Sequence, residues 1–218
     1  MNTFQVVKDF ERAVGEYTNA PYVVSVNSCT MALLLAVAWH LKNDRGRLPV
    51  QSVDIPKRTY VGVAQSIIHA GGRPTFRDQD WKGAYQLRPY NIWDSARWFT
   101  SGLYAMTEGP NGEQPFGVGA MVCVSFHWSK TLGIQQGGAI LHDNAEADSW
   151  LRRARFDGRQ EGVPPRWQEL DQWIRGWHCY MSPEIAAGGL VRLANLPKHN
   201  EPIPNDDYAD LSRFPIFQ

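Results

Sequence analysis

A lysine near the middle of the chain stands where it could act chemically. The segment Ser125-Phe-His-Trp-Ser-Lys130 leaves an apolar run and precedes a glycine-rich turn that extends from Gly133 to Gly138. A lysine at the edge of a hydrophobic core is unfavourable unless it is exposed or chemically used, and Schiff-base formation is one such use. Taken alone, Lys130 is explained better as a solvated surface lysine.

Two other segments place polar groups at the ends of apolar runs. Asp94 follows the run Asn91-Ile-Trp93, and open α/β sheets bind ligands at the carboxyl ends of their strands. The segment Asn27-Ser-Cys-Thr30 separates a β-branched run from a helical pattern. Its N–H groups and the Thr30 hydroxyl could meet a phosphate at the positive end of a helix. Helix N-caps are the alternative explanation for both segments.

Together, these groups match what one cofactor needs. Pyridoxal phosphate (PLP) requires a lysine for a Schiff base, a carboxylate that keeps the pyridine nitrogen protonated, and a helix N-terminus with hydroxyl groups for the phosphate. Motifs for other chemistry are missing from the sequence: a complete dinucleotide fingerprint, a Walker loop, histidines or cysteines at metal-binding spacing, and a G-x-S-x-G elbow. We therefore expect PLP as the cofactor and no metal.

Alternating helices and strands are predicted to position these groups. Apolar spacings of three and four predict helices, and short β-branched runs predict strands. The helices are expected over 3–18, 30–42, 60–70, 146–156 and 183–196, and the strands over 22–26, 53–55, 74–76, 91–93, 121–126 and 138–141. Because the strands are apolar on both faces and helices separate them, we expect an α/β fold with a mostly parallel sheet and helices on both faces.

Composition narrows the class of protein. The 218 residues carry 22 basic and 22 acidic side chains, so no overall field favours nucleic acid or an anionic membrane as a partner. The longest apolar run, from Met31 to Trp39, is shorter than the roughly 20 residues of a membrane-spanning helix. Charged residues near the N-terminus and an odd number of cysteines, three, predict a cytoplasmic protein.

The sequence resembles the DegT/StrS family of PLP-dependent sugar aminotransferases from about Phe10 to Leu196. Six blocks, in the family's order, carry the resemblance. Val26-Asn-Ser-Cys-Thr-Met-Ala-Leu is similar to nSGTaAL, Ile55-Pro-Lys-Arg-Thr-Tyr-Val to vPaxTfv, Asp94-Ser-Ala-Arg to DaAq, Ser125-Phe-His-Trp-Ser-Lys to SFhxxK, Gly137-Gly-Ala-Ile to GGai, and Tyr180-Met-Ser with Ala186-Ala187 to yrmseiqAA.

The resemblance implies a fold and a set of site residues. The fold would be the large domain of an aspartate aminotransferase-like, fold-type I transferase over residues 1–196, followed by an irregular tail over 197–218. Lys130 would bind PLP covalently and move a proton between substrate and cofactor, and Asp94 would pair with the pyridine nitrogen. The other implied cofactor-binding residues are a stacking aromatic, Tyr60, whose alternative is a core tyrosine, and the phosphate-binding Cys29, Thr30 and Ser125.

Two site positions depart from the family's pattern. Arg97 stands where the family has a glutamine near the phenolic oxygen of PLP, and His178 replaces an asparagine that the neighbouring subunit lends to the phosphate. Either change could preserve cofactor binding while slowing turnover, or could reflect a chain that has lost activity.

A nucleotide diphosphate could contact four arginines, although a solvated helix face explains them better: Arg152, Arg153, Arg155 and Arg159.

Two segments are shorter than in the family. Only residues 77–90 separate the strands at 74–76 and 91–93, where the family inserts a helix, a strand and a second helix. We therefore expect a sheet shortened by one internal strand, in which the strands at 53–55 and 91–93 are direct neighbours. Residues 197–218 are too few for the family's C-terminal small domain. Four aromatic residues around the first deletion could cover the gap or join a subunit contact, although ordinary core aromatics explain them somewhat better: Trp81, Tyr85, Trp93 and Trp98.

These observations lead to one functional interpretation and two alternatives. The chain is expected to be a minimal, homodimeric PLP-dependent aminotransferase that transfers an amino group from an amino acid such as glutamate to a nucleotide-linked keto sugar. The first alternative is an inactive homologue that retains a PLP or nucleotide-sugar pocket. The second is a structural α/β module without a ligand.

Overall fold

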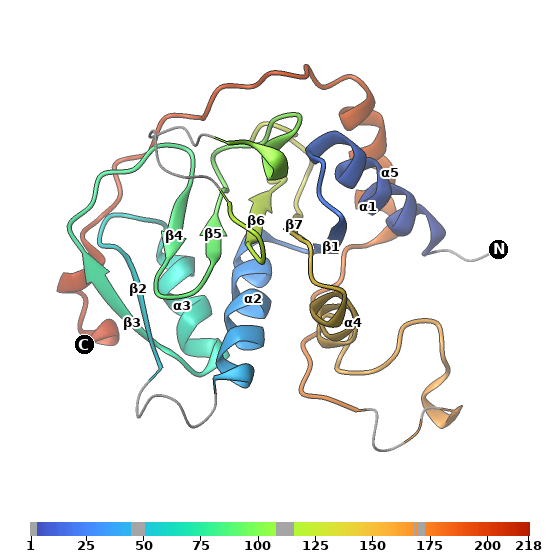
Figure 1. Cartoon of the computed structure of the whole chain (residues 1–218), viewed down its shortest axis with the longest axis horizontal. Coiled ribbons are helices and arrows are strands. Elements are labelled where there is room, and N and C mark those ends of the chain that lie inside the picture. Colours follow the sequence, from blue (N-terminus) through green and yellow to red (C-terminus); the bar gives the residue numbers. More distant parts are fainter. Residues whose placement is uncertain (1–3, 45–50, 108–115, 168, 170–172) are drawn as a thin grey trace.

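The computed structural model describes residues 4–44, 51–107, 116–167, 169 and 173–218 (Figure 1). Its α-helices are α1 (Gln5–Thr18), α2 (Cys29–Asn43), α3 (Val61–Ala70), α4 (Ala145–Ala154) and α5 (Pro183–Ala194). Its strands are β1 (Tyr22–Val26), β2 (Ser52–Pro56), β3 (Arg73–Arg77), β4 (Tyr85–Leu87), β5 (Ile92–Asp94), β6 (Met121–Ser125) and β7 (Gly138–His142). Of these elements, β4 is the one that the sequence does not predict.

The main sheet is mixed, and the prediction of a mostly parallel sheet is wrong. Its strand order is β1-β7-β6-β5-β4. Strands β5 and β6 pair in parallel, whereas β7 is antiparallel to both β1 and β6, and β4 is antiparallel to β5. Buried strands are apolar on both faces whatever their direction, so the pattern does not report direction. The connection between two strands does indicate their direction, because a parallel neighbour needs a long crossover, usually a helix. Residues 126–137, which connect β6 to β7, contain no helix.

Strand β4 also corrects the expectation for the shortened segment. The strands at 53–55 and 91–93 are not direct neighbours, because β4 lies between β2 and β5. It pairs with β5, and just beyond its end Arg88 exchanges two backbone hydrogen bonds with Asp54 of β2, with N–O distances of 2.7 and 3.0 Å. A short antiparallel strand thus fills the place where an internal strand was expected to be lost. It pairs backbone groups that direct removal of a strand would leave unsatisfied.

Helices cover both faces of the sheet, as expected (Figure 1). Side chains alternate along each strand, so Met121 and Cys123 of β6 join the core beneath α2, α3 and α4. Val122 and Val124 point into the second core, beneath α1 and α5. Trp93 and Trp98 are buried in that second core, which agrees with their interpretation as ordinary core aromatics.

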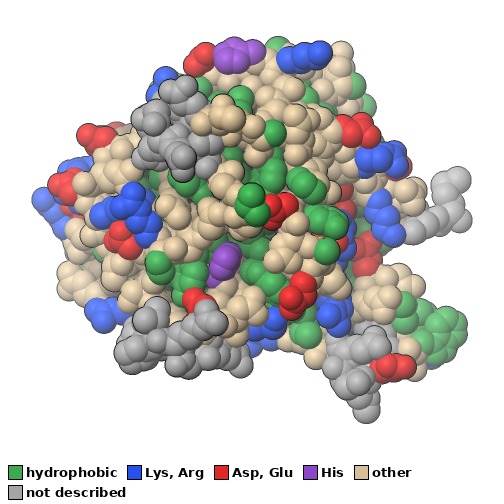
Figure 2. Space-filling model, viewed as in Figure 1, with side chains coloured by type: hydrophobic (Ala, Val, Ile, Leu, Met, Phe, Trp, Pro, Cys, Tyr) green, Lys and Arg blue, Asp and Glu red, His purple; other side chains and the backbone are tan. Residues whose placement is uncertain are grey.

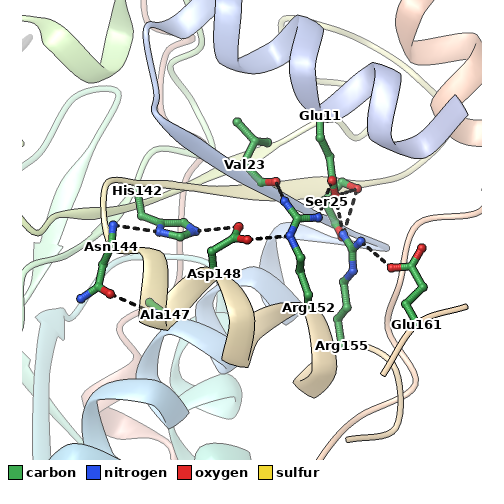
Figure 3. Close-up of polar contacts among 10 residues, drawn as sticks. All are labelled: Glu11, Val23, Ser25, His142, Asn144, Ala147, Asp148, Arg152, Arg155 and Glu161. Atoms are coloured by element: carbon green, nitrogen blue, oxygen red, sulfur yellow. Dashed lines mark hydrogen bonds and ion pairs between the residues drawn. The ribbon is translucent and has the colours of Figure 1, made fainter. Parts of the chain in front are cut away.

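A buried ion-pair network attaches α1 and α4 to the edge strand β1 (Figure 3). Glu11 of α1 forms ion pairs with Arg152, at 2.7 Å, and with Arg155. The backbone N–H of Ser25 donates to the same carboxylate at 2.9 Å, and Arg152 donates to the Val23 carbonyl at 3.0 Å. Arg155 is 1% exposed. The interpretation of these arginines as a solvated helix face is therefore wrong for Arg155 and Arg152.

The C-terminal tail, residues 197–218, is packed along the molecule. It runs from α5 across the end of the sheet to the β2–β3 pair, where Leu211 and Phe217 are buried (Figure 1). Backbone hydrogen bonds fix it on the way, from Ile203 N–H to the Arg97 carbonyl and from Leu211 N–H to the Lys57 carbonyl, both at 2.8 Å. Apart from short 3-10 turns at Leu211–Arg213 and Pro215–Phe217, it lacks regular structure.

The surface carries charges of both signs. On the face drawn in Figure 2, basic and acidic side chains of the described residues are interspersed. None of the helices in the described part of the chain has the length and apolar character needed to cross a membrane.

Candidate active site

One cavity brings most of the predicted site residues together. It has a volume of about 410 Å³, within the usual range for small-molecule sites. It lies where β1, β5 and β6 end and α2 and α3 begin. Seven predicted residues line it: Cys29, Thr30, Tyr60, Asp94, Arg97, Ser125 and Lys130.

The start of α2 forms one wall of the cavity. Ser28 is the N-cap, and its hydroxyl oxygen accepts a hydrogen bond from the Met31 N–H at 3.2 Å. The N–H groups of Cys29 and Thr30, in the first turn, have no carbonyl partner within the helix. Strand β7 approaches this turn so closely that a Cβ on Gly138 would lie 2.5 Å from the Cys29 nitrogen. Glycine at this position therefore allows the helix start to lie against the sheet.

Asp94 ends β5 and is 5% exposed. Its Oδ2 accepts a hydrogen bond from the Tyr85 hydroxyl at 2.7 Å, and its Oδ1 accepts one from the Ala96 N–H at 3.0 Å. Burial raises the pKa of Asp94, whereas these two hydrogen bonds and the charge of Lys130 act in the opposite direction. Each carboxylate oxygen retains capacity to accept a second hydrogen bond.

Tyr85 and Thr59 belong to the site, although no sequence pattern predicts a role for them there. The Thr59 hydroxyl lies 2.7 Å from the Tyr85 hydroxyl, so a hydrogen-bonded chain runs from Thr59 through Tyr85 to Asp94. Burial and the nearby Asp94 charge raise the pKa of Tyr85 well above its usual value. Tyr85 is therefore protonated at neutral pH and donates to Asp94. No signal identified it, because β4 is too short for a periodic pattern.

Lys130 lies in the turn that follows β6 and is half-buried. Burial and the neighbouring charge of Arg97 lower the pKa of Lys130, and the charges of Asp206 and Asp94 oppose this shift. Its ammonium group forms no ion pair within the described residues. A lysine with a lowered pKa has a larger fraction of neutral amine, which is the nucleophilic form.

Residues of the C-terminal tail bind the Arg97 side chain, and no sequence pattern predicts these contacts. The side chain of Arg97 is buried, and its Nε donates to the Tyr208 hydroxyl at 3.0 Å. Its two terminal nitrogens donate to the Pro204 carbonyl and to the Asp206 carboxylate. Asp206 and Tyr208 also line the cavity. No motif or periodic pattern marks them, since the tail is polar and irregular.

The other predicted residues that line the cavity are Tyr60, Cys29 and Ser125. Tyr60, at the start of α3, is 56% exposed. A Cβ on Gly62 would lie 2.5 Å from the Tyr60 ring, so glycine leaves room for that ring. Burial raises the pKa of Cys29 well above its usual value, so this thiol is neutral. Ser125, at the end of β6, is buried.

His178 lies outside the cavity. Its side chain is exposed, and its Nδ1 lies 2.9 Å from the Asp157 carboxylate. The role expected for His178 concerns the site of a neighbouring copy, and it stays a prediction.

A sequence model of one protein family matches most of the chain. The sequence model described as the DegT/DnrJ/EryC1/StrS aminotransferase family matches residues 1–96 and 101–202. The spore coat polysaccharide biosynthesis protein SpsC of Bacillus subtilis (strain 168) is 24% identical over 226 residues. That match covers 87% of this chain and 57% of SpsC, so the chain spans little more than half the length of this relative.

Solved structures share the fold. A DegT DnrJ EryC1 StrS aminotransferase from Brucella abortus superposes with a TM-score of 0.63 at 22% identity, covering 87% of this chain and 58% of that one. The sugar aminotransferase CalS13 from Micromonospora echinospora superposes with a TM-score of 0.62 at 19% identity, covering 87% of this chain and 61% of that one. At these identities, the likeness concerns the fold alone.

Proposed function

The chain belongs to the DegT/DnrJ/EryC1/StrS aminotransferase family, and on this premise we propose that it is a PLP-dependent aminotransferase acting on a keto sugar. One observation carries the proposal: a half-buried lysine, a buried carboxylate and a helix N-terminus surround the same cavity of about 410 Å³. These are the groups that PLP chemistry requires. The names of the similar proteins, a polysaccharide biosynthesis protein and a sugar aminotransferase, support a sugar as the acceptor.

The chemistry of the cavity fits PLP. Asp94 has spare acceptor capacity for the pyridine N–H, and the Tyr85 hydroxyl holds its carboxylate in place. The N–H groups of Cys29 and Thr30, which have no carbonyl partner within the helix, would hold the phosphate together with the Ser125 hydroxyl. The ring of Tyr60 would cover the pyridine. When bound, PLP supplies an electron sink for the substrate's reacting carbon.

Lys130 would move the proton during transfer. Its amine, which has a lowered pKa, can accept a proton from the substrate carbon and donate that proton again in a later step of the transfer. Burial raises the pKa of Asp94, and its hydrogen bonds and Lys130 oppose that rise. Its carboxylate would pair with the pyridine nitrogen and keep that nitrogen protonated. In this proposal, Lys130 carries the proton and Asp94 supplies a fixed negative charge.

Substrates and a second copy complete the proposal. An amino acid such as glutamate would donate the amino group, and a nucleotide-linked keto sugar would accept it. The active form would be a homodimer, in which His178 of each copy reaches the phosphate site of the other. The exposure of His178 on the surface is compatible with this role.

A cofactor-binding experiment tests the proposal. Purified protein is mixed with PLP, its visible absorbance is recorded, and the complex is reduced with borohydride and mapped by peptide. We expect a band from lysine-bound PLP and a label on Lys130. The Lys130→Ala variant should lose both, whereas Lys42→Ala, at an exposed lysine outside the cavity, should keep them. Wild-type protein without band or label would contradict PLP dependence.

The second candidate is an inactive homologue that retains the pocket. One observation favours it: tail residues occupy the hydrogen-bond donors of Arg97 inside the cavity. Transfer of an amino group from glutamate to a nucleotide-linked keto sugar, lost in Lys130→Ala, would exclude this candidate. PLP binding without transfer to any keto sugar tested would favour it.

A further inference from the structure

The contact between Arg97 and the tail joins a deeply buried group to an exposed one. The Arg97 side chain is 4% exposed, whereas that of its ion-pair partner Asp206 is 69% exposed. The other two hydrogen-bond partners of the guanidinium, the Pro204 carbonyl and the Tyr208 hydroxyl, belong to the same short segment. A single stretch of five residues, 204–208, thus satisfies Arg97 from the solvent side.

This contact lies inside the cavity that holds Lys130. Arg97, Asp206 and Tyr208 line the cavity together with Lys130 and Asp94. Asp206 lies near enough to Lys130 for its charge to affect the lysine's ionisation. An anion that replaced Asp206 on Arg97 would therefore lie beside the amine that we propose as the proton carrier.

The chemistry of the pair favours exchange over simple opening. Arginine presents a planar fork of donors that matches a carboxylate. Removing Asp206 alone would leave the buried guanidinium without its negatively charged partner, which is strongly unfavourable. Replacing it with another carboxylate keeps the net charge and the hydrogen bonds. The contact is therefore stable in the absence of a ligand and open to competition by one.

The tail is bonded to the fold on both sides of this segment, and the segment itself contacts Trp81, through the Asn205 side chain and the Tyr208 ring. On one side, Ile203 N–H is bonded to the Arg97 carbonyl, and on the other, Leu211 N–H is bonded to the Lys57 carbonyl, both at 2.8 Å. Leu211 is buried. Between these anchors, Asn205 and Asp206 are exposed. Displacing residues 204–208 need not detach the rest of the tail.

We propose that Arg97 binds a carboxylate group of the amino-acid substrate, and that Asp206 occupies this place until the substrate displaces it. The identity of the ligand as an amino acid rests on the proposed aminotransferase function. The exchange of one carboxylate for another does not require the cofactor. Asp206 is thus an internal competitor, and residues 204–208 form a strap that opens when a carboxylate substrate binds.

Glutarate, a dicarboxylate without an amino group, is the probe for this exchange. It is titrated by calorimetry into cofactor-free wild-type protein, Asp206→Asn and Asp207→Asn. Because a tethered competitor acts at high effective concentration, we expect Asp206→Asn to bind glutarate about tenfold more tightly than wild type. Asp207 is exposed and forms no ion pair within the described residues, so Asp207→Asn should bind as wild type does. Equal affinity in all three proteins would overturn the proposal.

Variants of Arg97 test whether its guanidinium binds the carboxylate of the ligand. Arg97→Gln should abolish glutarate binding, and Arg97→Lys should weaken it, since lysine retains the charge without the fork. Thermal melting of each variant shows whether it is folded. Inorganic phosphate is titrated in parallel, and binding as tight as that of glutarate would indicate a general anion site and overturn the carboxylate assignment. Retained glutarate binding in folded Arg97→Gln would overturn it as well.

Hydrogen exchange tests the opening of the strap. Addition of glutarate to wild-type protein should speed amide exchange in residues 205–208 and leave exchange at Leu211 unchanged. Slower exchange, or none of the expected change at saturating glutarate, would contradict displacement. PLP binding is measured separately by absorbance, so a failure of the cofactor proposal can be told from a failure of this one.

Discussion

The hydroxyl of Tyr85 lies 2.7 Å from Oδ2 of Asp94, so that strand β4 holds the carboxylate at the end of the neighbouring strand β5. The two residues are direct partners in the antiparallel ladder. Because the strand that carries Tyr85 stands where an internal strand was expected to be lost, the shortened segment itself contributes to the candidate site. Tyr85 acts on Asp94 and is a positioning residue in this arrangement.

Replacing Tyr85 with phenylalanine tests this relationship. Tyr85→Phe removes the hydrogen bond to Asp94 and leaves the Thr59 hydroxyl without its partner, so PLP should bind about tenfold more weakly, in line with the loss of one or two hydrogen bonds. Loss of a bond to the charged form should also raise the pKa of Asp94 further. As the pH is lowered, the PLP affinity of Tyr85→Phe should therefore begin to fall at a higher pH than that of wild type. Absorbance titrations with PLP across pH measure both effects.

The control for Tyr85→Phe is a second tyrosine outside the cavity. The Tyr104 hydroxyl donates to the Ala120 carbonyl at 3.0 Å, so Tyr104→Phe also removes one hydrogen bond. Its PLP affinity and pH profile should match those of wild type. If Tyr85→Phe lowered stability but left PLP affinity and its pH profile unchanged, Tyr85 would have a structural role only.

Gly138 is expected to be essential for the position of the α2 N-terminus. In Gly138→Ala, the added Cβ would lie 2.5 Å from the Cys29 nitrogen, so the helix start or β7 must shift. We expect a loss of about 1–3 kcal/mol in the free energy of unfolding, as for other overpacked sites, together with weaker PLP binding. Urea unfolding and PLP titration measure the two effects.

Gly188 in α5 provides the matched substitution. A Cβ there meets nothing within 4 Å, and alanine is favoured over glycine within a helix by about 1 kcal/mol. Gly188→Ala should therefore be neutral or stabilising and should bind PLP as wild type does. If Gly138→Ala behaved like Gly188→Ala, close packing of β7 against α2 would not matter to the site.

Local patterns predicted most elements and drew attention to Asp94, Lys130 and the start of α2, and the family resemblance implied Tyr60, Arg97 and Ser125. Contacts distant in sequence were missed. Residues 22–26 form the strand that their β-branched run predicts, and Asp94 and Lys130 follow apolar runs that are buried in any strand direction. The direction of β7 depends on how the chain returns from β6. The contact of Asp206 with Arg97 joins residues 109 positions apart, and nothing in the polar tail around it marks a partner.

The Glu11–Arg155 pair should contribute strongly to stability. Arg155→Met leaves the Glu11 carboxylate, which is 5% exposed, with one charged partner fewer. Breaking a buried pair in this way typically costs about 3–5 kcal/mol in the free energy of unfolding. The control is Arg12→Met, which breaks an exposed pair with Asp9 that is worth at most about 1 kcal/mol. Urea unfolding that gave similar losses for both variants would contradict a structural role for the network.

The same network predicts how stability depends on acid. Burial alone would raise the pKa of Glu11, but the charges of Arg155 and Arg152 bring it down from 4.5 to about 2. A carboxyl whose pKa is lower in the folded state stabilises the protein above its unfolded pKa, and that contribution is lost as pH falls through the folded value. The lowering is worth roughly 3 kcal/mol at neutral pH. This part of the stability should be complete above about pH 5 and should disappear between pH 4.5 and 2.

Glu11→Gln measures this contribution directly. The variant should be less stable than wild type at pH 7, and the difference in unfolding free energy should narrow as the pH is lowered from 4.5 toward 2, because protonated Glu11 resembles glutamine. Glu16→Gln, at an exposed carboxyl on the same helix, should change neither the stability at pH 7 nor its dependence on acid. Urea midpoints at several pH values provide the comparison. A Glu11→Gln deficit that stayed constant across this range would show that the ionised carboxylate does not stabilise the fold through Arg152 and Arg155.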